Sequence, residues 1–334
     1  MSAVDHRGPF DGFGGAPGEQ SLAVLAERAK TPGRPMREAT PAESRAAQYT
    51  WLPYMGTPAE GVTTTDRFIP GPHGDIPVRV HVPTGEGPFP ALVAFHGGCW
   101  IVGNVEVIDL PHKSLAAATG CVVVAVNYAK APEHRFPAPL QDCVAGYAWT
   151  HEHAAELNLD SSRIGVVGDS AGGNLSATVS LVTRDGGLPG FDEPLPAPAV
   201  QVLVYPATDW RLDTASAEEF ADGFGLSTAD MSWSWYQYVA SEDDLKNPFV
   251  APAEAASLAG LPPAIMVTAG ADVLRDEGVF YAQRLAADGV PVEHLHYPEA
   301  LHGFWWMAGA VDDCARMEAD IASALEKLWG SPMA

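Results

Sequence analysis

The sequence predicts an α/β protein in which a mostly parallel sheet is flanked by helices. Two observations carry this prediction. From about residue 62, short apolar runs rich in β-branched residues alternate with stretches of helical periodicity, a pattern typical of a parallel sheet covered on both faces. The 334-residue chain is also 47% hydrophobic and contains 33 Gly and 29 Pro, which suits one large core with many tight turns.

Seven runs are expected to form strands, and five helices are expected between or after them. The runs are IPVRVHV, PALVAFHG, CVVVAVNY, RIGVVGD, AVQVLVYP, AIMVTAG and VEHLHYP. The helices cover about residues 109–118, 139–156, 171–183, 275–287 and 311–328, where apolar residues recur at helical spacing. Together these elements predict one main domain over residues 61–334, without an internal repeat.

Residues 1–60 precede this domain and are expected to form an arm and two cap helices. Residues 1 to about 20 are rich in Gly and Asp with little periodicity, as in a mobile arm. The segment SLAVLAERAK then shows helical spacing, and TPAE at 40–43 is a capping box with proline at the first helical position.

Residues from about 210 to 245 interrupt the alternation after the LVYP run and are expected to complete the cap. This insertion contains a second capping box at 227–230 and places Met231, Trp235 and Val239 on one helical face. Long connections of this kind often border a functional site. The alternative is that these side chains only form the buried stripe of a helix.

Composition limits the partners and the location of the protein. A formal net charge of -23 at pH 7 would repel nucleic-acid phosphates and anionic lipid headgroups. The first 20 residues show no export signal, and no stretch is long enough to span a bilayer. The four cysteines are scattered, without zinc or disulfide spacing: Cys99, Cys121, Cys143 and Cys314. We therefore expect a cytoplasmic protein that does not bind nucleic acid and is not integral to a membrane.

The pentapeptide Gly168-Asp169-Ser170-Ala171-Gly172 lies between a predicted buried strand and a helix of small residues. In such a Gly-x-Ser-x-Gly turn the glycines let strand and helix approach closely, so that the serine Oγ is exposed on a strained turn. The turn also places Oγ at a helix N-terminus, where the partial positive charge favours a developing anion. We expect Ser170 to be a catalytic nucleophile.

A glycine-rich loop, FHGGCW at 95–100, follows the strand PALVAF. Glycines let backbone N–H groups point at the negative oxygen of a tetrahedral intermediate without interference from side chains. We expect the N–H groups of Gly97 and Gly98 to form an oxyanion hole together with that of Ala171. A simple strand-to-helix turn would account for one glycine here, but not for His-Gly-Gly.

The order of the chain selects the partners of Ser170. In this kind of fold the acid follows the serine after a late strand, and the histidine follows the last strand. Asp272 comes directly after AIMVTAG, and His302 lies shortly beyond VEHLHYP, next to a glycine. We expect His302 to act as the base while Asp272 holds the imidazole in the right tautomer.

Other titratable side chains are given structural roles. Asp276 and Glu277 are expected in the first turn of a helix, where carboxylates are stabilising. His294 and His296 share one face of a strand, but no third ligand has suitable spacing, so we expect no metal site. Asp169 is expected to hold nearby backbone by hydrogen bonds.

These motifs resemble those of the hormone-sensitive lipase family of α/β-hydrolases, which includes many bacterial carboxylesterases. The resemblance covers about residues 65–330 and rests on HGGCW at 96–100, GDSAGGN at 168–174, DVLRDEG at 272–278 and HGF at 302–304. It implies an α/β-hydrolase fold with an eight-stranded sheet and a helical cap over the acyl pocket. The sequence departs from the family at Cys99, which replaces a glycine, and at Ala129 and Lys130, which replace Arg and Leu.

The motifs and the resemblance together predict a serine carboxylesterase that works through an acyl-enzyme, without a metal or cofactor. Aromatic residues favour short- to medium-chain acyl or aryl esters, and the expected substrate-binding residues are Cys99, Trp100, Phe224, Trp235 and Phe304. The expected partner is this small ester, and a homodimer stays open. Two alternatives also stay open: an amidase such as an arylformamidase, and a non-catalytic small-molecule receptor, against which His302 counts.

Overall fold

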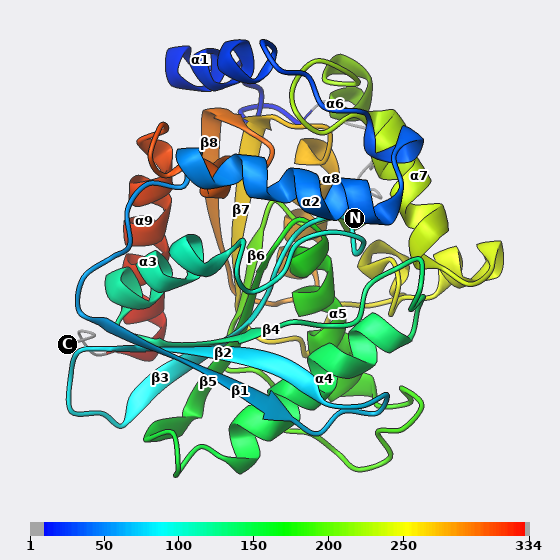
Figure 1. The fold of residues 1–334 in the computed structure, drawn as a ribbon. Helices are drawn as coiled ribbons and strands as arrows, with labels where there is room; N and C mark the ends of the chain where they lie inside the picture. Colours follow the sequence, from blue (N-terminus) through cyan, green and yellow to red (C-terminus); the bar gives the residue numbers. More distant parts are fainter. Residues whose placement is uncertain (1–9, 331–334) are drawn as a thin grey trace.

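The computed structural model describes residues 10–330, which form an eight-stranded sheet between layers of helices (Figure 1). β2 runs antiparallel to both of its neighbours, and all pairings from β4 to β8 are parallel. The predicted fold class is confirmed. In spatial order the strands are β1 (Val62–Ile69), β2 (Ile76–Pro83), β4 (Val122–Val126), β3 (Phe89–Phe95), β5 (Leu159–Asp169), β6 (Gln201–Val204), β7 (Ala264–Ala271) and β8 (Val292–Leu301).

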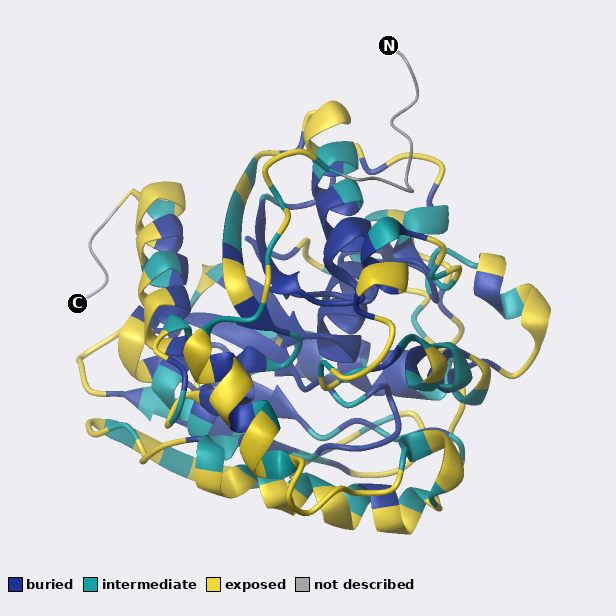
Figure 2. Ribbon diagram, turned by 90° about the horizontal axis from the view of Figure 1, so that it is seen from above, coloured by how far each residue is buried: buried dark blue, intermediate teal, exposed yellow. Residues whose placement is uncertain are grey.

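Helices cover both faces of the sheet, which explains why its central strands are apolar throughout. All five residues of β4, Val-Val-Val-Ala-Val, are buried, and Figure 2 shows the strands as the buried centre of the molecule with exposed residues on the outer helices. One face carries α3 (Asp109–Thr119) and α9 (Asp313–Trp329); the other carries α4 (Ala138–Glu152), α5 (Ala171–Asp185) and α8 (Arg275–Ala287). These five helices agree with the predicted ones to within a few residues.

The segments expected to form a cap lie along one end of the sheet (Figure 1). The N-terminal part consists of α1 (Glu19–Arg28), η1 (Met36–Glu38), α2 (Pro41–Gln48) and η2 (Tyr49–Tyr54), and the insertion contains α6 (Ala215–Glu219) and α7 (Thr228–Tyr238). The remaining short helices are η3 (Glu242–Lys246), η4 (Pro252–Glu254) and η5 (Phe304–Met307).

Both predicted capping positions start helices, and a hydrogen bond joins the two parts of the cap. The hydroxyl of Thr40 and the carboxylate of Glu43 each accept a backbone N–H of the other residue at the start of α2. At α7, Ser227 Oγ accepts the N–H of Asp230 at 3.0 Å. The same aspartate accepts a hydrogen bond from the Arg37 guanidinium at 3.1 Å, so η1 and α7 are held side by side.

Residues 10–18, which we expected to be mobile, are packed against β8. The N–H of Gly18 donates to the carbonyl oxygen of Glu299 at 3.0 Å, and the ring of Phe13 stacks on His294 with centroids 4.6 Å apart. A Cβ on Gly15 would lie 2.0 Å from the carbonyl oxygen of Pro298. The prediction of a mobile arm is therefore wrong for these residues, and its first nine residues lie outside the described part of the chain.

Residues 10–330 contain neither a membrane-spanning helix nor a cluster of metal ligands. None of their helices combines the length and the apolar composition needed to cross a membrane. Nowhere in this range do three or more His, Cys, Asp or Glu side chains cluster in a way that would hold a metal ion. His294 and His296 do share a face of β8, where both are hydrogen-bonded to the Thr268 hydroxyl at 2.9 Å.

Candidate active site

Ser170 lies on a sharp turn between β5 and α5. Its φ of 56° and ψ of -118° fall in a region that is strained for any residue with a side chain. The turn needs glycine on both sides, because a Cβ on Gly172 would lie 1.8 Å from the carbonyl oxygen of Phe95 and one on Gly168 would lie 2.2 Å from that of Gly172. The Gly-Asp-Ser-Ala-Gly sequence therefore folds into a tight strand-turn-helix with Ser170 directly before α5.

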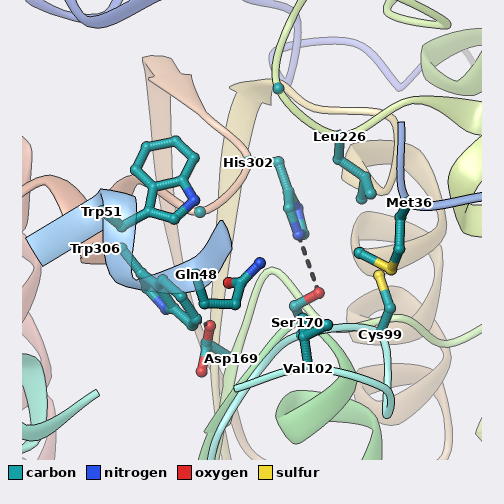
Figure 3. Close-up of a pocket in the computed structure, with 13 residues that line it drawn as sticks. Met36, Gln48, Trp51, Cys99, Val102, Asp169, Ser170, Leu226, His302 and Trp306 are labelled. Atoms are coloured by element: carbon teal, nitrogen blue, oxygen red, sulfur yellow. Dashed lines mark hydrogen bonds between the residues drawn. The ribbon is translucent and has the colours of Figure 1, made fainter. Parts of the chain in front are cut away.

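Three side chains from distant segments form a hydrogen-bonded chain at this turn. His302 Nε2 lies 3.0 Å from Ser170 Oγ (Figure 3), and His302 Nδ1 lies 2.8 Å from Asp272 Oδ2. Asp272 is 1% exposed, and its other oxygen accepts the N–H of Leu274 at 2.9 Å. Because a carboxylate only accepts hydrogen bonds, Nδ1 carries the proton and Nε2 is free to accept the serine hydroxyl.

The loop after β3 differs from the prediction at Gly97. Its N–H donates to Asp169 Oδ1 at 2.7 Å, deep in the protein, and the other oxygen of this carboxylate accepts the indole N–H of Trp306 at 2.9 Å. The Gly97 N–H is thus already paired and cannot bind an oxyanion, so the prediction that it is a donor is wrong. Asp169 holds the backbone of this loop, as its position suggested.

The next two residues of the loop are placed beside Ser170. Gly98 and Cys99 both line the cavity at the serine, and their φ angles of 116° and 55° lie in the left-handed region. Among the hydrogen bonds of residues 10–330, none uses the backbone N–H of Gly98, Cys99 or Ala171. These three N–H groups are unpaired donors in the two segments next to Ser170, so Cys99 replaces Gly97 among the candidate oxyanion donors.

A cavity of about 150 Å³ opens at Ser170 (Figure 3). Three separate parts of the chain contribute its walls, so the site is enclosed only when all three are folded together. The N-terminal part supplies Met36, Gln48 and Trp51, the insertion supplies Gly225 and Leu226, and the α/β core supplies Gly98, Cys99, Val102, Asp169, Ser170, His302, Gly303 and Trp306.

Of the five residues expected to bind substrate, Cys99 alone lines this cavity. Trp100 and Trp235 are fully buried against each other, with ring centroids 4.4 Å apart, and Trp100 also stacks on Tyr238 at 4.5 Å. The prediction is therefore wrong for both tryptophans. They form an aromatic core that joins α7 to the loop after β3.

Phe224 and Phe304 also lie outside the cavity, so the prediction fails for them as well. Phe224 packs edge-on against Phe220 at 5.2 Å, and Phe304 packs against Tyr205 at 5.6 Å. The ring of Tyr205 lies in turn 4.9 Å from that of His302. Phe304 thus packs on Tyr205, the ring that contacts the imidazole.

Burial alters the ionisation of several groups around the site. It raises the pKa of Asp169 to about 6, against the opposing effect of the hydrogen bonds from Gly97 and Trp306. Burial also raises the pKa of the Cys99 thiol to about 11, so this side chain is a neutral thiol in the cavity wall at pH 7.

Lys130, a departure from the family motif, lies outside the cavity. Its Nζ donates to Asn127 Oδ1 at 2.9 Å and to the carbonyl oxygen of Tyr128 at 3.0 Å. Burial lowers its pKa to about 8. The substitution therefore changes a supporting loop and leaves the cavity wall as it is.

Comparison with known proteins agrees with this geometry. The family described as alpha/beta hydrolase fold matches residues 92–306. The carboxylic ester hydrolase LipN of Mycobacterium tuberculosis is 40% identical over 263 residues, which cover 78% of this chain and 69% of that protein. An arylesterase of Saccharolobus solfataricus is 35% identical over 231 residues, 69% of this chain and 73% of that protein.

Solved structures of esterases have the same fold over nearly the whole chain. An ester hydrolase from the metagenome of Lake Arreo superposes with a TM-score of 0.86 at 33% identity, covering 94% of this chain and 100% of that one. An esterase of Pyrobaculum calidifontis gives 0.83 at 31% identity, covering 94% and 99%. The chain therefore belongs to the α/β-hydrolase family, and within it to the hormone-sensitive lipase group that its motifs resemble.

Proposed function

We propose that the protein is a serine carboxylesterase in which Ser170 is the nucleophile. The observation that carries the proposal is the hydrogen-bonded chain from Ser170 through His302 to Asp272, at the mouth of a small and mainly apolar cavity. The names of the relatives, which are ester hydrolases and esterases, support an ester over an amide as the bond that is cleaved.

The first half of the reaction forms an acyl-enzyme. Ser170 Oγ attacks the ester carbonyl while its proton passes to His302 Nε2, and Asp272 stabilises the resulting imidazolium. The carbonyl oxygen becomes negative and is bound by the unpaired N–H groups of Gly98, Cys99 and Ala171. When the intermediate collapses, the imidazolium gives its proton to the leaving alcohol, and the acyl group stays on Oγ.

The second half releases the acid and restores the enzyme. A water molecule takes the place of the alcohol and gives its proton to His302 Nε2 as it attacks the acyl carbon. The same three N–H groups bind the second tetrahedral intermediate. Its collapse breaks the bond to Oγ, which takes back the proton from His302.

The cap limits which esters reach Ser170. We assign residues 1–60 to an N-terminal arm and cap helices, and 61–334 to the catalytic domain with a cap insertion at about 210–245, because Met36, Gln48, Trp51 and Leu226 close the cavity over the serine. A cavity of about 150 Å³ suits short- to medium-chain acyl or aryl esters. A non-catalytic receptor would not need a histidine at hydrogen-bonding distance from the serine.

The test is Ser170→Ala, assayed on p-nitrophenyl butyrate. We expect kcat to fall by about 10⁴- to 10⁶-fold, the range seen when such a nucleophile is removed. Ser180→Ala is the matched control, because the hydroxyl of this buried serine of α5 donates to the carbonyl oxygen of Ser176 at 2.9 Å and lines no part of the cavity. A fluorophosphonate should label the wild type and the control but not Ser170→Ala. A folded Ser170→Ala protein that keeps more than about a hundredth of the activity would refute the proposal.

A further inference from the structure

The cavity has two chemically different walls. Figure 3 shows Met36, Cys99 and Leu226 on one side of Ser170 and His302, and Gln48, Trp51 and Trp306 on the other. The first wall consists of sulfur and aliphatic side chains. The second consists of two indoles and a carboxamide. Since an ester has a group on each side of its carbonyl carbon, its two halves must meet different surroundings.

Two polar side chains of the second wall have no hydrogen bond among residues 10–330: Gln48, and Trp51, whose indole can only donate. Neither the amide oxygen nor the amide nitrogen of Gln48 takes part in a hydrogen bond within residues 10–330. Trp306 and Asp169, by contrast, are occupied: the Trp306 indole N–H donates to Asp169, and the two Asp169 oxygens accept from Trp306 and Gly97. Apart from Ser170 and His302, Gln48 is the one described lining residue whose side chain has both a strong donor and a strong acceptor.

The position of Gln48 relative to Ser170 is fixed by the helix that carries it. Gln48 is the last residue of α2, one turn beyond Arg45 on the same face. The Arg45 guanidinium donates to the carbonyl oxygens of Ile101 at 2.9 Å and Ala131 at 3.1 Å, and pairs with Glu133 at 2.6 Å. Since residue 101 directly follows the loop at 95–100, α2 is tied to the loop that places the oxyanion.

The indoles beside Gln48 favour a flat group. Trp306 is 7% exposed and is held by its hydrogen bond to Asp169. Trp51 is also held, because the Arg28 guanidinium lies 3.5 Å from the centre of its ring. Two fixed aromatic side chains with an unpaired carboxamide between them and the serine form a surface for an aromatic ring or planar amide that carries a hydrogen-bonding substituent.

We propose that Gln48 is a specificity-determining residue, which hydrogen-bonds an amide or hydroxyl group in the half of the ester that lies against Trp51 and Trp306. The other half is a short aliphatic group against Met36, Cys99 and Leu226. The substrate class is thus an ester of mixed character, aliphatic on one side and planar with a polar substituent on the other. This inference rests on the proposed esterase activity and adds its substrate class.

The experiment compares two pairs of esters that differ in one polar group. The first pair, 3-acetamidophenyl and 3-ethylphenyl propionate, varies the alcohol half. The second pair, the p-nitrophenyl esters of 3-acetamidopropanoic and hexanoic acid, varies the acyl half. For each pair we take the ratio of kcat/KM, polar over apolar, in the wild type and in Gln48→Leu. Intrinsic differences in reactivity cancel when the two ratios are compared.

We expect Gln48→Leu to lower this ratio by about three- to tenfold for one of the two pairs, the effect of one neutral hydrogen bond. The change should appear in KM, because the contact is made equally in the ground state and the transition state. Gln20→Leu is the matched control: this exposed glutamine of α1 bonds to Asp312 and should keep both ratios.

The outcomes separate this inference from the proposed function. Ratios that stay unchanged in Gln48→Leu for both pairs, in an enzyme that hydrolyses all four esters, would refute the role of Gln48 alone. A wild-type protein that hydrolyses none of the four would instead contradict the esterase. A ratio lowered equally by Gln20→Leu would also overturn the inference, because the effect would then not come from the cavity.

Discussion

Asp169 connects three loops of the site through one carboxylate. It precedes Ser170, accepts the N–H of Gly97 in the loop after β3, and accepts the indole N–H of Trp306, four residues beyond His302. Two acceptor oxygens are needed for these two donors. An asparagine offers one oxygen and one NH₂ group, which would face a donor, so the carboxylate is the side chain that suits this position.

Asp169→Asn should therefore change how stability depends on pH. The folded pKa of about 6 lies above the ordinary value near 3.9, so the folded state binds more protons between these values and loses stability as the pH rises through this window. The variant lacks this loss. From pH 5 to pH 7, the free energy of unfolding of Asp169→Asn should rise by about 1 kcal/mol relative to the wild type.

Urea denaturation at several pH values measures this difference. The same change at the exposed Asp222 is the control and should follow the wild type. Parallel curves for Asp169→Asn and the wild type would contradict a raised pKa in the folded state. Asp169→Asn should also shift the loop after β3, because Gly97 loses its acceptor. We therefore expect a lower kcat on p-nitrophenyl butyrate, since oxyanion donors act only when they are aligned.

Single residues also show which parts of the site the sequence could predict. Ser170, Asp272 and His302 could be chosen because motif and chain order restrict them, and the structure brings them within hydrogen-bonding distance. Which N–H groups of the loop at 95–100 are unpaired could not be predicted. Whether Gly97 has a free N–H depends on Asp169, 72 residues away, and no local pattern shows that contact.

The cavity wall was harder to predict than the hydrogen-bonded chain. We predicted that Trp100 and Trp235 bind substrate because they are large and aromatic, but large apolar side chains are also often buried in the core. Gln48 and Trp51 lie in the N-terminal helices. Both residues belong to the segments expected to form a cap. The sequence did not show which face of these helices turns toward Ser170.

At the scale of elements, α2 depends on Arg45 for its docking. The helix has eight residues, and helices this short are marginal without tertiary contacts. Arg45→Met keeps the aliphatic stem and removes the hydrogen bonds to Ile101 and Ala131 and the ion pair with Glu133. We expect faster hydrogen exchange in residues 41–54 and a KM raised by about three- to tenfold, the effect of one or two lost hydrogen bonds.

Mass-spectrometric hydrogen exchange and steady-state kinetics measure these two effects. Arg34→Met is the matched control, because Arg34 is exposed and reaches only Glu43 and the carbonyl oxygen of Glu38 within the described residues. The midpoint of global unfolding should move little, since the sheet does not use this contact. Unchanged exchange in α2 would show that other contacts hold the helix.

Elements with strong periodicity were predictable, and β1 was not. The helix expected at about 311–328 is found as α9, Asp313–Trp329, because its buried residues Cys314, Met317, Ile321 and Leu325 recur at helical spacing. The sequence of β1, VTTTDRFI, is mostly polar, and the strand lies at the edge of the sheet with only Ile69 buried. A strand with little to bury leaves a weak pattern, so β1 becomes evident only through its pairing with β2.

At the scale of the whole molecule, the net charge of -23 should make stability depend on salt. Like charges on a compact body repel one another and favour the expanded chain. Raising NaCl from 0.01 to 0.15 M shortens the screening length from about 30 to about 8 Å. We expect Tm to rise by about 2 °C or more, which corresponds to about 1 kcal/mol of stabilisation in a protein of this size.

Differential scanning fluorimetry measures the shift. Sucrose at the same concentration is the control, because it carries no charge and cannot screen. Screening also weakens the individual surface ion pairs, such as Arg67 with Glu156, but exposed pairs contribute little each. A Tm that falls with NaCl would mean that local pairs outweigh the net repulsion.

The overall class of the fold was predictable, while the order of the strands was not. Apolar runs alternating with helices require a parallel sheet covered on both faces. In the sheet, β4 lies between β2 and β3. This order depends on the path of the connections between strands, which the apolar pattern does not reveal. The cavity at Ser170 is lined by three distant segments, and their meeting likewise depends on how the chain is connected in space.

Arg45 ties the cap to the body of the enzyme through main-chain oxygens at positions 101 and 131. Every amino acid presents such an oxygen, so a substitution at either position that keeps the backbone in place would leave the acceptors of Arg45 intact. Substitution of Met36, Gln48 or Trp51 would therefore change the wall of the cavity while leaving this attachment and the hydrogen bonds of Ser170 in place.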